Sequence, residues 1–87
     1  MLRITPEVVD DVAVLKVEGS VTGPWVSELR KAVEARAARS GRVTLDLSEV
    51  RYVDAEGATL LRELMRAHAQ LGRRSTFVAA LLEGGTR

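Results

Sequence analysis

Two short runs of alternating apolar and polar residues open the chain. Residues 2–5 read Leu-Arg-Ile-Thr, and residues 12–18 read Val-Ala-Val-Leu-Lys-Val-Glu. A period of two is typical of a half-buried β-strand, and the second run is rich in β-branched residues. The pattern predicts an antiparallel hairpin formed by these runs, with a polar connection over 6–11 and an end at Gly19.

Helical spacing replaces this alternation from Trp25 onward. Apolar residues fall at positions 25, 26, 29, 32, 33 and 37, directly after Pro24, which suits the first position of a helix. We expect Thr22 or Gly23 to cap this helix and Ser40-Gly41 to end it. Trp25 is expected to pack against the sheet edge.

A third strand and a second helix follow. Residues 43–47, Val-Thr-Leu-Asp-Leu, predict a strand parallel to 12–18 and joined to it by a right-handed crossover, because a helix separates the two. Segment 48–53 is expected to be a connection anchored by Tyr52 and Val53. Asp54 is a strong candidate for a helix cap. The apolar face of its helix is expected to comprise Gly57, Leu60, Leu61, Leu64 and His68.

The remaining segments complete a small α/β architecture. Residues 70–74 fit either a frayed helix end or a short edge strand, and 76–83 predict a short final helix. The order is therefore β-β-α-β-α-(β)-α over a single domain, 1–87. We expect a mixed sheet of three or four strands with helices packed on it.

Composition limits which residues can form the core and which functions the protein can perform. Aromatic residues are 3% of the chain, so we expect a core of Val, Leu and Ala. There is no cysteine and only one histidine, His68, so we expect no metal site, cofactor or enzymatic activity. A net charge of +1 without a basic arm argues against nucleic-acid binding. Without a signal-peptide pattern or a membrane-length apolar run, we expect a cytoplasmic protein that does not insert into membranes.

The most informative segment runs from strand 43–47 into the next helix. It reads Val43-Thr-Leu-Asp-Leu-Ser48 and then Val53-Asp54-Ala55-Glu56-Gly57. This pair of motifs resembles the STAS domain family, which contains bacterial anti-sigma-factor antagonists and sulfate-transporter tails. The family has Leu-Asp-Leu-Ser, a short loop, and Asp-Ser-Ser-Gly at a helix start. Gly19-Ser20-Val21-Thr22 also stands where the family usually has Gly-Glu-Leu-Asp.

The resemblance implies a protein–protein interaction module in transcription regulation. In the family, a serine kinase that is also an anti-sigma factor phosphorylates the second Ser of Asp-Ser-Ser-Gly. Glu56 occupies that position here and cannot be phosphorylated by such a kinase, so the usual phosphoserine switch is absent. We hypothesise that Glu56, a partial phosphate mimic, fixes one binding state.

The resemblance also implies a partner-facing surface around the start of the second helix. We expect it to be lined by Thr22, Ser48, Glu49, Asp54, Ala55, Glu56, Ala58, Thr59 and Arg62. The expected partner is a serine kinase and anti-sigma factor. An alternative is docking on an ABC-type ATPase of a lipid transporter, as small STAS subunits do, and another is nucleotide binding. The chain itself is expected to be a monomer or a weak homodimer.

Simpler interpretations accompany several of these residues. Glu56 also suits the first helical turn as a charge that stabilises the helix dipole, and Asp54 suits the helix cap. The carboxylates of Asp46, Glu49, Asp54 and Glu56 are close in sequence, and we expect the function at this acidic cluster. Thr59 is the nearest candidate to replace the missing serine hydroxyl.

Overall fold

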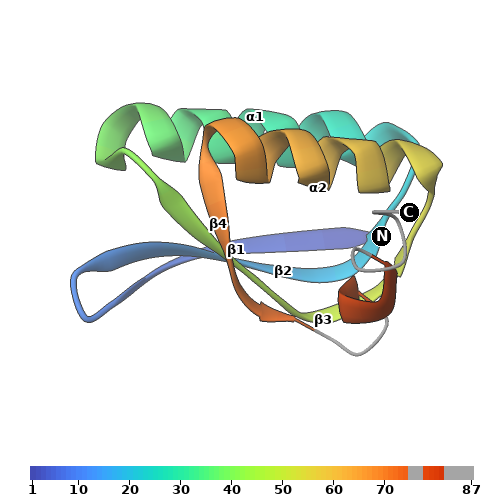
Figure 1. Ribbon diagram of the computed structural model, residues 1–87, viewed down its shortest axis with the longest axis horizontal. Coiled ribbons are helices and arrows are strands. Elements are labelled where there is room, and N and C mark those ends of the chain that lie inside the picture. The colour runs from blue at the N-terminus through green and yellow to red at the C-terminus, as the bar shows by residue number, and fades with distance from the viewer. Residues whose placement is uncertain (75–77, 82–87) are drawn as a thin grey trace.

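Four strands form one mixed sheet, and two helices lie side by side over one of its faces (Figure 1). The computed structural model describes residues 1–74 and 78–81. The elements are β1 (Leu2–Val9), β2 (Val12–Val21), α1 (Pro24–Ser40), β3 (Val43–Val53), α2 (Ala55–Ala67) and β4 (Ala69–Arg74). The strand order in the sheet is β1-β2-β3-β4, so β1 and β4 are its edge strands. The predicted α/β class and element order are confirmed.

The opening hairpin is confirmed, and it is longer than the alternation indicated. β1 continues through Pro6 and pairs antiparallel with β2 from Leu2 opposite Gly19 to Val9 opposite Val12. The expected connection over 6–11 is therefore wrong. The turn consists of Asp10 and Asp11 alone, with φ of 51° and 66°. A two-residue turn of type I′ has positive φ at both positions, which aspartate tolerates better than most residues.

The three later strands are parallel, as predicted for the strand pair around the first helix. β2 pairs with β3, and β3 pairs with β4, which settles 69–74 as an edge strand. β2 continues past Gly19, and β3 includes the segment 48–53 that was expected to be a connection. The pairing register shifts beside Lys16 and again at Gly19. Such irregularities break the strict alternation, so the sequence pattern ends before the strand does.

Both helices pack on the sheet through the predicted apolar faces. In α1 the side chains of Leu29 and Val33 are fully buried, and in α2 the same holds for Leu60, Leu61 and Leu64. Helix α1 begins at Pro24 and ends before Gly41, as expected. Trp25, which was expected to pack against the sheet edge, is 37% exposed.

The buried hydrophobic residues among those described are all Val, Leu or Ala, which confirms the composition argument. Residues 78–81 are helical, and Val78 is buried in the same core. The rest of the predicted final helix, 76–77 and 82–83, lies outside the described residues. In the described part of the chain, neither helix is long and apolar enough to cross a membrane.

Candidate functional site

The carboxylate of Asp54 joins the starts of both helices. Its Oδ1 accepts a hydrogen bond from the backbone N–H of Gly57 at 2.7 Å, which caps α2. Its Oδ2 accepts from the backbone N–H of Gly23 at 3.0 Å, and Gly23 is the N-cap residue of α1. The expected cap at Asp54 is confirmed, and its second bond satisfies the backbone N–H of Gly23, one of the N–H groups at the start of α1 that have no partner within the helix.

A close approach of α2 to the sheet fixes the same region, where both helices begin. We call this region the corner. A Cβ atom on Gly57 would collide with the carbonyl oxygen of Val21 and lie 2.9 Å from Val53 Cγ1. That carbonyl oxygen also accepts the backbone N–H of Asp54 at 3.2 Å. The glycine in the motif is therefore a steric requirement, because only a residue without Cβ lets the first turn of α2 reach the end of β2.

Exposed side chains surround this rigid corner. Ala55 and Glu56 are exposed in the first turn of α2, and Thr59 is exposed one turn later. Thr22, from the loop before α1, is half-buried and accepts the backbone N–H of Trp25 through its carbonyl oxygen at 2.9 Å. Both helices begin at the same end of the molecule (Figure 1). The structure thus brings these residues of two separate segments together.

A shallow groove of about 350 Å³ continues from Ala55 and Glu56 between the two helices. Arg30 of α1 bridges it, since its Nη2 lies 2.8 Å from Glu63 Oε1 of α2. Thr59 lines the groove, and its hydroxyl donates to the carbonyl oxygen of Ala55 at 3.1 Å. The Thr59 hydroxyl is therefore engaged by its own helix.

Two large aromatic side chains are exposed near the same corner, and the list of partner-facing residues expected from the sequence contains neither. Trp25 is 37% exposed and Tyr52 is 53% exposed. Each lies two positions from a residue of the Gly23–Asp54 hydrogen bond. Tyr52 was expected to be an apolar anchor like Val53, which is indeed buried; for Tyr52 that expectation is wrong. An exposed aromatic residue beside a rigid backbone is typical of protein interfaces.

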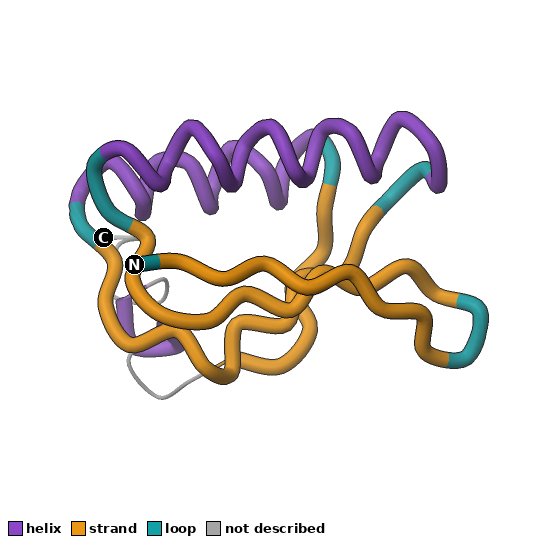
Figure 2. The backbone as a smooth tube through the Cα atoms, turned by 180° about the vertical axis from the view of Figure 1, so that it is seen from behind, coloured by secondary structure: helices purple, strands orange, loops and turns teal. Residues whose placement is uncertain are grey.

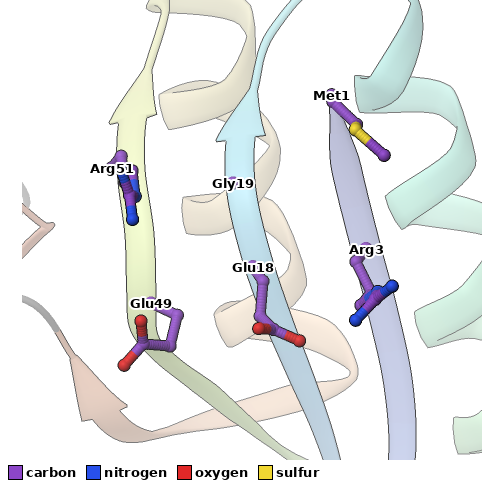
Figure 3. A pocket seen from close by; sticks show the side chains of 6 residues that line it. All are labelled: Met1, Arg3, Glu18, Gly19, Glu49 and Arg51. Carbon is purple, nitrogen blue, oxygen red and sulfur yellow. The ribbon is translucent and has the colours of Figure 1, made fainter.

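The structure separates other predicted residues from this corner. Ala58 is only 5% exposed and packs in the core, so it offers almost no surface to a partner. Glu49 lies on the face of the sheet opposite the helices, with Arg3, Glu18 and Arg51 around a pocket of about 270 Å³ (Figure 3). Because α2 covers the other face, Glu49 and Glu56 do not share a surface.

The acidic cluster expected from the sequence is dispersed in space. Asp46 Oδ1 accepts the backbone N–H and the hydroxyl of Ser48, at 3.1 and 2.7 Å, within β3. Asp54 caps the helices, whereas Glu49 and Glu56 lie on different faces. No group of three or more candidate metal ligands occurs among residues 1–74 and 78–81. Arg62 is half-buried one turn beyond Thr59, at the border of the corner.

Six exposed or half-buried residues lie within five positions of Gly23 or Asp54, whose hydrogen bond joins the starts of the two helices. We call this set the helix-start surface. It comprises Thr22, Trp25, Tyr52, Ala55, Glu56 and Thr59.

A mixed sheet with two helices on one face, their starts joined by a capping aspartate, defines a class of small α/β folds. The family model described as "Mlab, STAS domain" matches residues 4–84. The chain therefore belongs to the STAS domain family. No curated protein matches its sequence.

Solved structures of the same fold agree with this assignment. An anti-sigma factor antagonist from Mycobacterium paratuberculosis is 22% identical, with a TM-score of 0.76 over 97% of this chain and 79% of that one. The anti-sigma factor antagonist SpoIIAA in its unphosphorylated form is 15% identical, with a TM-score of 0.73 over 97% and 81%. A STAS domain from Rhodobacter sphaeroides, also an antisigma-factor antagonist, is 22% identical, with a TM-score of 0.63 over 91% and 90%.

Proposed function

We propose that this protein is a regulatory protein–protein interaction module that binds its partner through the helix-start surface. The single observation that carries this proposal is the exposure of Trp25 and Tyr52 close in sequence to Gly23 and Asp54. The Asp54 carboxylate holds that part of the backbone in place by accepting two backbone N–H hydrogen bonds. Trp and Tyr give a large binding contribution when a partner covers them, and a rigid backbone loses little entropy on binding. Glu56 and Thr22 supply a polar rim.

Of the residues predicted from the sequence to face a partner, the structure supports some as contacts and not others. Ala55, Glu56, Thr59, Thr22 and Arg62 stay as proposed contacts, because they lie at or beside the corner. Asp54 acts as the positioning residue beneath them. Ser48, Glu49 and Ala58 are left out, since they lie in β3, on the opposite sheet face and in the core.

The partner that we favour is a serine kinase of the anti-sigma-factor type. The anti-sigma factor antagonists in the comparison share this fold, which supports the class of partner. Glu56 is exposed and has no hydroxyl for the kinase to phosphorylate. A permanent charge there would hold the surface in one binding state, without the change of roughly two charges that phosphorylation brings.

Substitution of Glu56 by Ser or by Ala tests this proposal. With the partner identified by affinity capture, we expect either variant to change its dissociation constant by about fivefold or more, since both remove a rim charge. Isothermal titration calorimetry measures the change. Glu49→Ser is the matched control, because Glu49 is also exposed but lies on the face of the sheet opposite α2. Wild-type affinity in both Glu56 variants would overturn the role of Glu56.

The second candidate partner is an ABC-type ATPase. Glu56 in place of the family's serine is the observation that favours it, since a structural subunit of a transporter needs no phosphorylation switch. Both candidates use the same surface, so the identity of the captured ATPase separates them. A gene neighbourhood with a permease and an ATPase would support the transporter, and one with a histidine-kinase-like ATPase would support the sigma pathway.

We do not favour the alternative of a nucleotide-binding module. A phosphate group binds readily to free N–H groups at the start of a helix. Here the Asp54 carboxylate already accepts from the backbone N–H of both Gly23 and Gly57. An incoming phosphate would have to displace a carboxylate of the same sign of charge.

A further inference from the structure

The tip of the β1–β2 hairpin is an apolar projection with an acidic end. Val8, Val9 and Val12 are 67%, 51% and 42% exposed around the Asp10–Asp11 turn. The tip extends past the ends of the helices, at the end of the molecule opposite the helix starts (Figures 1 and 2). Paired strands and a two-residue turn make it a preformed element. Val9 and Val12 are paired across the hairpin and lie on one face, whereas Val8 lies on the other, so the tip exposes apolar side chains on both faces.

An apolar groove of about 280 Å³ lies between the β1 edge and α1. Ile4, Pro6 and Leu15 line it from the sheet. Ala32 and Ala35 line it from the helix, and two cationic residues, Arg36 and Arg39, complete it. The groove thus combines an apolar lining with two positive charges.

One of these arginines has an incomplete set of hydrogen bonds. Arg36 Nη2 reaches the carbonyl oxygen of Glu7 at a long 3.4 Å. Its Nε is buried and has no hydrogen-bond partner within the described part of the chain. The buried Nε is out of reach of a docking molecule, whereas the Nη atoms of the guanidinium are the ones that a carboxylate docked in the groove would pair with.

We propose that a second copy of this chain occupies the groove, with the hairpin tip of each copy docked on the other. The valines of the tip match the apolar lining, and Asp10 and Asp11 match Arg36 and Arg39 in charge. The tip and the groove both include β1, so a twofold axis beside this strand allows each copy to give and to receive one tip.

Pro6 defines how the two copies meet. It lies in the middle of the edge strand β1 and has no N–H to donate to another strand. A continuous ladder of hydrogen bonds between two β1 edges is therefore interrupted at its centre. The contact is made by side chains in the groove, which gives a closed dimer rather than an extended sheet.

This contact is independent of the proposed function. The tip and the groove share no residue with the helix-start surface. The dimer therefore forms whether or not the partner is bound, and it presents two helix-start surfaces at once. Failure of one proposal leaves the other unaffected.

Sedimentation velocity over about 10 µM to 1 mM tests the proposal, a range suited to a weak interface of this size. We expect a monomer–dimer equilibrium whose dissociation constant rises with added NaCl. The double variant Asp10→Asn/Asp11→Asn removes both charges while asparagine tolerates the positive φ of the turn. We expect it to raise the dissociation constant about fivefold.

Two further variants make the test specific. Arg36→Gln/Arg39→Gln should weaken the dimer to a similar degree from the groove side. Glu18→Gln/Glu28→Gln, which changes the net charge as much as the tip variant, should leave it unchanged, because neither residue lies at the tip or in the groove. A wild-type monomer throughout the range would overturn the proposal, and so would a dimer that tolerates both the tip and the groove variants.

Discussion

Replacement of Asp54 by alanine is expected to lower the free energy of unfolding by about 2–3 kcal/mol. The side chain caps α2 through Gly57 and also accepts the backbone N–H of Gly23 at the start of α1. Loss of a helix cap costs about 0.5–2 kcal/mol, and loss of the second hydrogen bond adds about 0.5–1.5 kcal/mol. In a domain of this size each kcal/mol corresponds to about 4–8 °C in Tm. Urea denaturation and calorimetry measure the loss.

Asp54→Asn is the informative companion variant. Its one carbonyl oxygen can replace one carboxylate oxygen, while its NH₂ group cannot accept the second N–H. We therefore expect a loss of stability between those of wild type and Asp54→Ala. Glu56→Ala, in the same turn but exposed and without a cap bond, should change stability by less than about 1 kcal/mol. Equal stability of Asp54→Ala and Glu56→Ala would contradict the joint cap.

Replacement of Gly57 by alanine is expected to destabilise the fold by about 3 kcal/mol. Alanine is the better helix former by about 1 kcal/mol, so propensity alone predicts the opposite sign. The added methyl group would collide with the carbonyl oxygen of Val21, which is backbone and already accepts the Asp54 N–H. Relief of that collision requires α2 to move away from β2, which opens packed core.

Thermal unfolding of Gly57→Ala and of wild type shows whether the substitution lowers or raises the stability of the fold. A crystal structure of the variant, if it folds, should show the first turn of α2 displaced from Val21. A higher Tm than wild type would mean that the close approach of α2 to the sheet does not limit this position.

Much of the fold could be predicted from local pattern alone. The hairpin, the parallel strands and the helix boundaries at Pro24 and Gly41 follow from periodicity and residues that begin or end helices. Asp54 is identifiable as a cap because an aspartate before an amphipathic run has few other roles. Its second bond, to Gly23, was not predictable, since it joins residues that only the packing of both helices brings together.

The ends of the strands and the residues of the site could not be predicted from the sequence, for a related reason. Pro6 argues against a strand interior, yet at a sheet edge its missing N–H is tolerated. The register shifts in the β2–β3 pair hide the end of β3 from any test of alternation. Tyr52 and Glu49 belong to that hidden part, so which face each side chain occupies could not be counted from the sequence.

The central claim is that a protein partner covers the helix-start surface, and site-specific photo-crosslinking tests it most directly. A photoreactive residue is placed at Glu56 or at Thr59, and as control at Arg66, which is exposed at the far end of the same helix. We predict that positions 56 and 59 capture the same ATPase-class protein from lysate of the native cells, that position 66 does not, and that Trp25→Ala strongly reduces the yield. Equal capture at position 66, or none at 56 and 59, would contradict the proposed interface.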